Sequence, residues 1–472
     1  MRAPDQSRAL STSEAVLWRT ESPALRLPVI AMLTLDTSPD WARLRRAVQR
    51  LLHGNALLRS RPAEPALGVG RPRWAPVRDL DLSCHLRRVR LPAPYDPDHA
   101  VELARTMAMT PFDPSRPLWE VVLGLTADDG EAVLLCKMHH AIADGFSALR
   151  MLAALCEEHS PGEHSSEDPA QVPLRVVPAP AQDGPLDTGP GRCTPAGLVG
   201  AALSGARSLA GAVTDRPLSL AAPLLGTAAR TTALLRSSAS ALFPPAPPSP
   251  VLRGRSTSRT LRIMEVPREA LRDAGRLVGG TTHDAYLTGV LGGLRHYQTA
   301  LGTGSRSVPM AVAVALPPKG AADGSNRFSG LRMAGPVGEP DPLLRLRAVH
   351  AAVRAARATP PVDPDGLGPL SRLLASAPAP CVRLLAGHLA ADDVHCTYVP
   401  GPERSLSLAG TGVRRLHPFA PVVNCALSVA MFSYDGTCAI GMNMDSAAVR
   451  QPDLLHSSLV TGFEEVTSLV RS

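Results

Sequence analysis

Hydrophobic residues follow two kinds of pattern along this chain, and the two kinds alternate. Short runs of apolar residues, such as Pro28–Leu35 and Val133–Met138, are typical of β-strands. Other segments repeat apolar residues every three or four positions, as Leu44, Val48 and Leu51 do, which is typical of an amphipathic helix. Because strand and helix patterns alternate, the sequence predicts an α/β (α+β) fold.

Composition divides the chain into three parts. Strand and helix patterns alternate over residues 1–156 and again over 253–472, whereas residues 157–252 are rich in Pro, Gly, Ser and Ala. We therefore expect two domains joined by a linker that carries small-residue helices. Near the start of the chain, Ser11 and Glu14 have the spacing of a helix capping box.

Two further local predictions concern the first part of the chain. Residues 55–62, NALLRSRP, are predicted as strand, and a helix is predicted from about Pro97 to Met109. Trp119 opens a run of Val and Leu that is predicted as another strand, and a single Trp in that position most often belongs to the core.

Charge and apolar content exclude several classes of protein. The 472 residues are 19% charged and 44% hydrophobic, as in a globular protein with a substantial core. The net charge of +7 comes from scattered arginines without interleaved aromatic residues, so we expect no nucleic-acid partner. No apolar run approaches the ~18 residues of a membrane span, and the first residues lack the apolar segment of a signal peptide. We expect a cytoplasmic protein, with room for peripheral contact with a membrane or lipid droplet.

The stretch with the clearest chemical content follows the apolar run that ends at Met138. His139 and His140 come directly after it, and Asp144 and Gly145 follow at the predicted start of a helix. Histidine is suited to acid–base chemistry because its unperturbed pKa is about 6.5. Taken alone, however, a histidine pair at a strand end is more often structural than catalytic.

Other chemistries find less support in the residues. A metal site formed by His139, His140 and Asp144 is disfavoured because adjacent residues of a strand point to opposite faces. His283 and Asp284 can be read as a second dyad or, more simply, as residues that open and cap a helix. The sequence contains no GxSxG motif, P-loop or dinucleotide fingerprint, and its eight cysteines form no CxxC pair.

Several motifs resemble those of a known family. HHAIADG, residues 139–145, resembles the HHxxxDG signature of the superfamily that includes chloramphenicol acetyltransferase, condensation domains and plant BAHD enzymes. RPLWE, residues 116–120, resembles the PLW motif of the wax ester synthase/diacylglycerol acyltransferase family, and STSEAVLWRTES resembles its opening segment. Later segments, including SNRFSG, VPGP and SYDG, resemble motifs of the same family in the same order, so the likeness covers nearly the whole chain outside the linker.

The resemblance implies two chloramphenicol-acetyltransferase-like domains with a channel between them. It implies transfer of a long-chain acyl group from acyl-CoA, as co-substrate, to the hydroxyl of diacylglycerol or of a long-chain alcohol, with no permanently bound cofactor or metal. His140 would be the general base, His139 would be mainly positional, and Asp144 would pair with an arginine to hold the turn. Gly145 would leave room for the turn and the substrate. The implied channel residues are Pro117, Leu118, Trp119, His283, Asp284 and Asn326.

Three departures from the family pattern bear on the substrate. His283 replaces the Asn of an Asn-Asp pair, Ser325 replaces the Gly before Asn326, and Thr397-Tyr398 replace a Ser-Asn pair. They motivate one alternative to the lipid acyltransferase, a divergent family member that acts on a specialised metabolite. A second alternative is a non-catalytic scaffold that binds acyl-CoA. The intact HHxxxDG motif argues against the scaffold.

Overall fold

The computed structural model describes residues 7–126, 130–158, 244–315, 328–358, 369–387 and 391–470. These residues all belong to one compact unit, formed by Met1–His159 and Leu234–Ser472. Most of the predicted linker, together with Ser325 and the predicted channel residue Asn326, lies outside the described residues.

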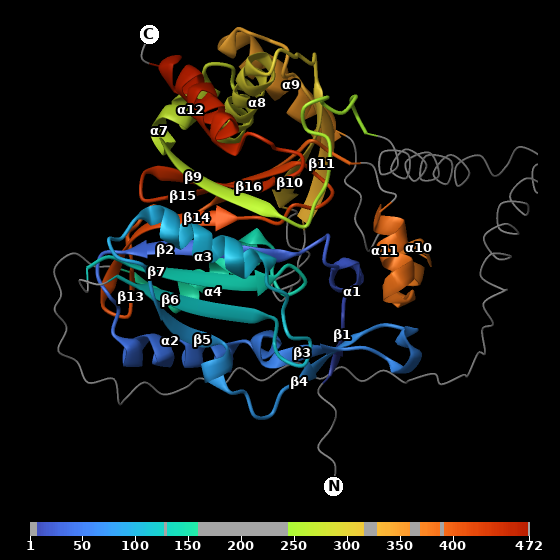
Figure 1. The fold of residues 1–472 in the computed structure, drawn as a ribbon, viewed down its shortest axis with the longest axis vertical. Coiled ribbons are helices and arrows are strands. Elements are labelled where there is room, and N and C mark those ends of the chain that lie inside the picture. Colours follow the sequence, from blue (N-terminus) through green and yellow to red (C-terminus); the bar gives the residue numbers. More distant parts are fainter. Residues whose placement is uncertain are drawn as a thin grey trace, which may run out of the picture. The chain divides into compact units, whose positions relative to one another are not determined.

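A central sheet organises the first part of the chain. Among the described residues it contains, in order across the sheet, β5 (Leu86–Arg90), β6 (Trp119–Leu125), β7 (Ala132–His139), β2 (Pro28–Leu35), β14 (Thr411–Phe419), β13 (Leu406–Leu408) and β8 (Glu157–Glu158) (Figure 1). β7 lies in the interior of this sheet, antiparallel to both β6 and β2. β14 and β13 come from the last quarter of the chain, so distant segments complete the sheet that carries the histidine pair.

Helices cover both faces of this sheet. α2 (Trp41–Gly54) and α4 (Gly145–Leu155) cover one face of the sheet, where they share a hydrophobic core with Leu134 of β7. α3 (Pro97–Met109) packs on the opposite face, where it meets Val133 and Leu135. Successive β7 residues thus enter two different cores, which explains why the run is apolar at every position instead of alternating. The predicted strand, turn and helix around the histidines are confirmed.

A second sheet organises the rest of the described chain. Its order is β11 (Phe328–Gly335), β10 (Val308–Ala315), β12 (Val394–Pro400), β15 (Leu427–Tyr434), β16 (Thr437–Asp445) and β9 (Arg259–Pro267). One face packs against α7 (Arg268–Arg276), α8 (Thr282–Ala300), α9 (Pro342–Ala358) and α12 (Pro452–Ser468), which lie together in Figure 1. β10, β12 and β15 run parallel, and the other pairs are antiparallel, so the sheet is mixed.

The remaining elements of the described chain belong to neither of these two sheets. They are β1 (Arg8–Ala9), α1 (Thr12–Thr20), η1 (Ala56–Arg59), β3 (Ser60–Ala63), η2 (Ala66–Gly68), β4 (Arg73–Pro76), η3 (Leu82–Cys84), α10 (Pro369–Ser376) and α11 (Ala379–Gly387). The capping box of α1 is confirmed, since the Glu14 carboxylate accepts from the Ser11 backbone N–H at 2.6 Å and the Ser11 hydroxyl accepts from the Glu14 backbone N–H at 3.2 Å. The strand predicted over 55–62 is only partly right, because its first half is a 3₁₀ turn capped by Asn55.

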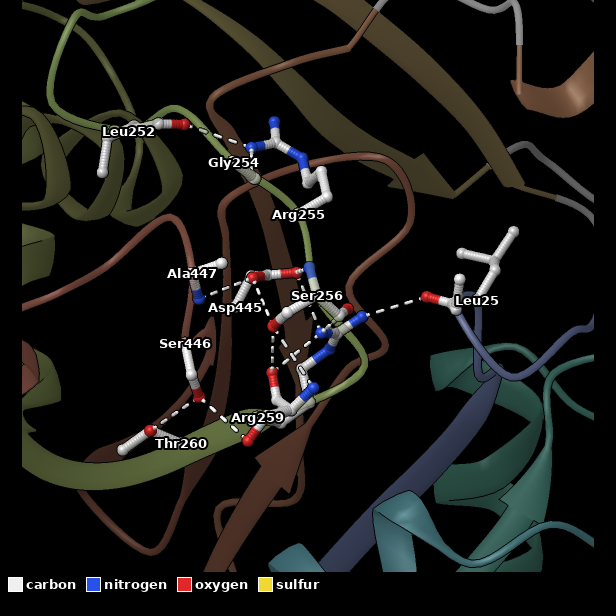
Figure 2. A network of polar contacts seen from close by, with 12 residues as sticks. Leu25, Leu252, Gly254, Arg255, Ser256, Arg259, Thr260, Asp445, Ser446 and Ala447 are labelled. Atoms are coloured by element: carbon white, nitrogen blue, oxygen red, sulfur yellow. Dashed lines mark hydrogen bonds and ion pairs between the residues drawn. The ribbon is translucent and has the colours of Figure 1, made fainter.

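A buried polar network joins the second sheet to the segment before β2. The Arg259 guanidinium lies 2.9 Å from Asp445 (Figure 2). It also donates to the Ala24 carbonyl at 3.2 Å. Asp445 accepts further hydrogen bonds from the backbone and hydroxyl of Ser256, each at 2.9 Å. A buried ion pair is stable only when its remaining polar atoms are satisfied, as they largely are here. The network therefore anchors the segment from Glu21 to Leu27, which also contacts both histidines.

Candidate active site

The end of β7 is held by backbone hydrogen bonds from two neighbours. The His139 backbone N–H donates to the Leu118 carbonyl at 3.0 Å, and the His140 backbone N–H donates to the Leu27 carbonyl at 2.9 Å. Leu118 precedes β6 and Leu27 precedes β2, so both flanking strands fix the point where β7 ends. Because successive side chains of a strand alternate in direction, the two imidazoles are sent to different environments.

The His139 side chain is fully buried, and each of its ring nitrogens lies within 3.0 Å of a neighbouring polar atom. Nδ1 accepts the Ala141 backbone N–H at 3.0 Å, so Nε2 carries the ring proton. Nε2 lies 2.6 Å from Oε2 of Glu21, within hydrogen-bond distance. The edges of Trp18 and Phe112 pack around the ring. His139 is not among the described residues that line the cavity, and its contacts are those of a positioned, structural side chain.

His140 lines a cavity of about 330 Å³. Burial is the main influence on its imidazole and lowers the pKa of His140 below its ordinary value, although the nearby Asp144 carboxylate opposes the shift. The neutral form is therefore the one present at pH 7, and a neutral imidazole is what a general base requires.

Asp144 and Gly145 form the turn into α4 and also line the cavity. Asp144 is the N-cap residue of α4, and its carboxylate accepts the Ser147 backbone N–H at 2.7 Å. A β-carbon at Gly145 would lie 2.9 Å from Cγ2 of Val399 in β12, closer than such atoms normally approach. Glycine therefore allows the HHxxxDG turn to contact the second sheet directly. The arginine partner expected for Asp144 stays a prediction.

The cavity takes its walls from both sheets and is largely apolar. The first part of the chain contributes β7 and α4 residues such as Met138, Leu149 and Leu152. The second sheet contributes five consecutive residues of β12, from His395 to Val399, with small residues of β10 and β15 beside them. Apolar cavities with few polar groups suit ligands with hydrocarbon chains.

Of the predicted channel residues Pro117, Leu118 and Trp119, only Trp119, the first residue of β6, is among the described lining. Trp119 lines the cavity, donates its indole N–H to the Leu58 carbonyl at 2.8 Å and stacks on His85 at 4.5 Å. Leu118 is fully buried and contacts His139 through its carbonyl. Pro117 and Leu118 are not among the cavity-lining residues of the described chain.

His283 and Asp284 lie at the start of α8, outside the described lining. Asp284 forms a capping box with Thr281 and lies 3.2 Å from Nδ1 of His350. The buried His283 ring lies 6.1 Å from that of Tyr398, and Tyr398 lines the cavity, so His283 is one residue removed from it. Burial lowers the pKa of His283 to about 4. Thr397 and Tyr398, two of the departures from the family pattern, both line the cavity.

Three features of the site were not singled out in the sequence. Glu21 belongs to the segment that resembles the family opening, but nothing local indicates that it meets His139. Lys137 is fully buried, donates to the Thr110 carbonyl at 2.8 Å and lies 3.4 Å from Glu120. His395 alternates with Thr397 along a predicted strand, a period-two signal that does not reveal which face meets a cavity.

The part of the chain that the structure describes shows neither a metal-binding cluster nor a membrane-spanning helix. No group of three or more His, Cys, Asp or Glu side chains there has the arrangement of a metal site. No helix in the same residues is both long and apolar enough to cross a membrane.

Family models match both parts of the chain. Residues 10–286 match the wax ester synthase/diacylglycerol acyltransferase catalytic domain, and residues 324–467 match the WS/DGAT C-terminal domain. A Mycobacterium tuberculosis protein, provisionally named a diacylglycerol O-acyltransferase, is 32% identical over 99% of this chain and 93% of its own length.

Solved structures share the fold at low sequence identity. The wax ester synthase/diacylglycerol acyltransferase from Marinobacter aquaeolei VT8 has a TM-score of 0.63 and 19% identity, covering 97% of this chain and 98% of its own. The first condensation domain of the calcium-dependent antibiotic synthetase has a TM-score of 0.60 and 17% identity, covering 98% and 97%. The fold is thus the two-domain, chloramphenicol-acetyltransferase-like one. With the matched family models and the 32% identical relative, this chain belongs to the wax ester synthase/diacylglycerol acyltransferase family and is an acyltransferase.

Proposed function

We propose that this acyltransferase moves a long-chain acyl group from acyl-CoA to the hydroxyl of diacylglycerol or of a long-chain alcohol, with His140 as general base. The observation that carries the proposal is the position of His140, a neutral imidazole on the wall of a large apolar cavity. The provisional names of the Mycobacterium relatives support diacylglycerol as the acceptor.

The reaction needs one base and no covalent enzyme intermediate. His140 removes the proton of the acceptor hydroxyl while its oxygen attacks the thioester carbonyl. As the C–O bond forms and the C–S bond breaks, the CoA thiolate leaves and takes the proton back from the His140 imidazolium. Acyl-CoA is a co-substrate in this scheme, and the chain needs no resident cofactor.

The other residues of the HHxxxDG turn position His140. His139, bound by Glu21, holds the end of β7, and Asp144 caps the helix that follows. Gly145 lets the turn contact Val399, so that both sheets line one cavity. These roles agree with the apolar walls, which exclude water from a thioester that water would otherwise hydrolyse.

A second candidate, transfer to a specialised metabolite, is favoured by one observation. Thr397 and Tyr398, which replace the Ser-Asn pair of the family pattern, both line the cavity and each carries a hydroxyl group, that of Tyr398 lying 3.3 Å from the Ser433 hydroxyl. Polar groups of this kind discriminate among acceptors by hydrogen bonding.

An acceptor matrix separates the two candidates. The purified protein is assayed with palmitoyl-CoA and, in turn, diacylglycerol, hexadecanol and a set of polar alcohols, with His140→Ala beside it. We expect turnover with the two lipid acceptors and a loss of about 10²- to 10⁴-fold in His140→Ala. Turnover confined to polar alcohols would replace the lipid proposal by the second candidate. Tight acyl-CoA binding without any transfer would indicate the scaffold.

The proposal includes peripheral contact with a lipid surface, because both acceptors partition into membranes and lipid droplets. Leu384 and Leu385 of α11 are 67% and 44% exposed, and Arg383 precedes them. Exposed leucines beside a basic residue are suited to the boundary between lipid headgroups and acyl chains.

A further inference from the structure

Lys137 is a buried cation close to the histidine pair that the proposed mechanism does not use. It lies on β7 two residues before His139, and its side chain is fully buried. Alternate residues of a strand share a face, so Lys137 and His139 point to the face that α3 covers, as Val133 and Leu135 do. Burial lowers the pKa of Lys137, and the neighbouring Glu120 carboxylate opposes the shift. Because a buried ammonium is costly, the groups that offset its cost are informative.

Three groups surround the Lys137 ammonium, and each attracts a cation. Nζ donates to the Thr110 carbonyl at 2.8 Å and lies 3.4 Å from Oε1 of Glu120, the residue opposite Lys137 on β6. Nζ also lies 4.0 Å from the centre of the Phe112 ring. Thr110 is the C-cap of α3, where helix carbonyls concentrate negative charge. Although Lys137 is among the residues that line the cavity, protein groups therefore match the three N–H donors of its ammonium.

Phe112 links Lys137 to His139. Its ring receives the ammonium on one face and meets the His139 ring edge-on, with the ring centres 6.0 Å apart. Phe112 is half-buried, whereas the other residues of 110–116 are exposed. The ring thus ties this segment to β7. The same segment continues to Leu118, whose carbonyl accepts the His139 backbone N–H at 3.0 Å.

We propose that Lys137 is a positioning residue for acyl transfer, which holds Phe112 and the end of α3 against β7 and so keeps the His139 ring and the adjacent His140 in place. This inference rests on the proposed function, because its effect on turnover passes through His140. In this role the ammonium touches no reacting atom. Loss of its charge should therefore lower kcat more than it changes KM for acyl-CoA.

Kinetics of variants of the full chain test this role. Lys137→Met removes the charge and keeps an unbranched apolar chain of nearly the same length, and water can reach the exposed Thr110 in its place. We expect kcat to fall by about 3- to 30-fold, the range of a buried cation–π contact, with KM for acyl-CoA within about 2-fold of wild type. Phe112→Leu should lower kcat to a similar extent. Phe112→Tyr keeps an aromatic face and should recover most of it.

The losses from the two sites should not add. Because Lys137→Met and Phe112→Leu break the same contact, the double variant should be little worse than either single variant. Arg345→Met is the matched control. Arg345 is also a fully buried cation that donates to a backbone carbonyl, that of Glu339 at 2.8 Å, and pairs with a carboxylate, but it lies outside the described cavity lining. This control should lower the melting temperature and leave kcat at the wild-type value.

A measurement on the His139 ring separates this inference from the proposed function. In magnetic resonance spectra of the full chain with isotopically labelled histidine, the Nε2–H signal of His139 is identified by its loss in Glu21→Ala. Lys137→Met should shift or broaden this signal, and Arg345→Met should leave it unchanged. If Lys137→Met fails to fold, the comparison of Phe112→Leu with Phe112→Tyr replaces it.

The inference requires both the altered signal and the fall in kcat. Either one without the other, or additive losses in the double variant, would overturn it. If wild type transfers no acyl group to any acceptor, the proposed function fails. The His139 signal then decides by itself whether Lys137 positions the ring.

Discussion

Nε2 of His139 lies 2.6 Å from Oε2 of Glu21, and this contact gives the two adjacent histidines different surroundings. Burial would raise the pKa of Glu21, but the hydrogen bond with His139 and the positive groups nearby outweigh it and lower that pKa. The carboxylate is therefore ionised at neutral pH and holds the His139 ring away from the cavity. His140, the next residue, lines the cavity.

Replacement of Glu21 should lower turnover without removing a reacting group. Glu21→Ala leaves a buried ring N–H unpaired, which costs about 1–3 kcal/mol and frees the end of β7 to move. We expect kcat to fall by about 10-fold or more with a smaller change in KM for acyl-CoA, in a steady-state assay. Glu21→Gln keeps an oxygen acceptor of the same size and should recover most of kcat. If Glu21→Gln is as poor as Glu21→Ala, hydrogen bonding to His139 is not the reason for the loss.

The contact between Gly145 and Val399 predicts a paired effect. A β-carbon at Gly145 would lie 2.9 Å from Cγ2 of Val399, so Gly145→Ala should push the turn away from the second sheet. We expect a loss of about 1–3 kcal/mol in unfolding free energy and reduced kcat/KM. Val399→Ala removes the clashing methyl groups, so the double variant should be closer to wild type than Gly145→Ala. Simple additivity of the two changes in denaturant unfolding would contradict the contact.

Activity should depend on the protonation of His140. Burial lowers the pKa of His140 below its ordinary value of about 6.5, and only the neutral imidazole can take a proton. The value of kcat/KM should therefore fall as pH decreases, with its midpoint below about 6.5, and should be level from there to about pH 8. A midpoint above pH 7 would show that His140 is not the titrating base.

Stability should fall in acid partly because of His283. Its pKa is about 4 in the folded chain and about 6.5 when unfolded, so the unfolded state takes up the proton first as pH falls. The contribution of neutral His283 is present above about pH 6.5 and is lost between about 6.5 and 4. His283→Asn, which restores the family residue, removes this titration. Its melting temperature should decline less than that of wild type from pH 7 to pH 5, and parallel declines would contradict the assignment.

Contact with a lipid surface should depend on α11. Leu384→Ser with Leu385→Ser should reduce co-flotation of the protein with vesicles that contain anionic lipid, because apolar surface that enters the headgroup region is removed. Leu277→Ser is the matched control, since Leu277 is 49% exposed but lies at the end of α7. Equal flotation of the α11 double variant and wild type would exclude α11 as the contact.

Local pattern was enough to place the elements around the site. The apolar run before His139 and the helical spacing after Asp144 predicted a strand, a turn and a helix, and the structure has β7 and α4 there with Asp144 as the N-cap. The same reasoning was less successful at residues 55–62. Asn55 caps a 3₁₀ turn there, and this side-chain hydrogen bond outweighs the strand preference of the residues that follow.

The sequence by itself determined the class of elements, the family and the chemical identity of the turn, because strand and helix periods arise from local backbone geometry and motifs are contiguous. Tertiary structure alone decided the partners of that turn. The local pattern of β14 is that of an ordinary strand and does not indicate its partner, yet β14 pairs with β2 in the first sheet. Glu21 contacts His139 only because the positions of α1 and β2, between which it lies, bring it to the end of β7. Such pairings depend on the sum of many weak contacts between distant segments. The repeat of hydrophobic residues within one segment does not show which other segment it will pair with. His395 shows the same limit, since alternation gave its spacing along β12 and only the packed sheets directed it toward the cavity.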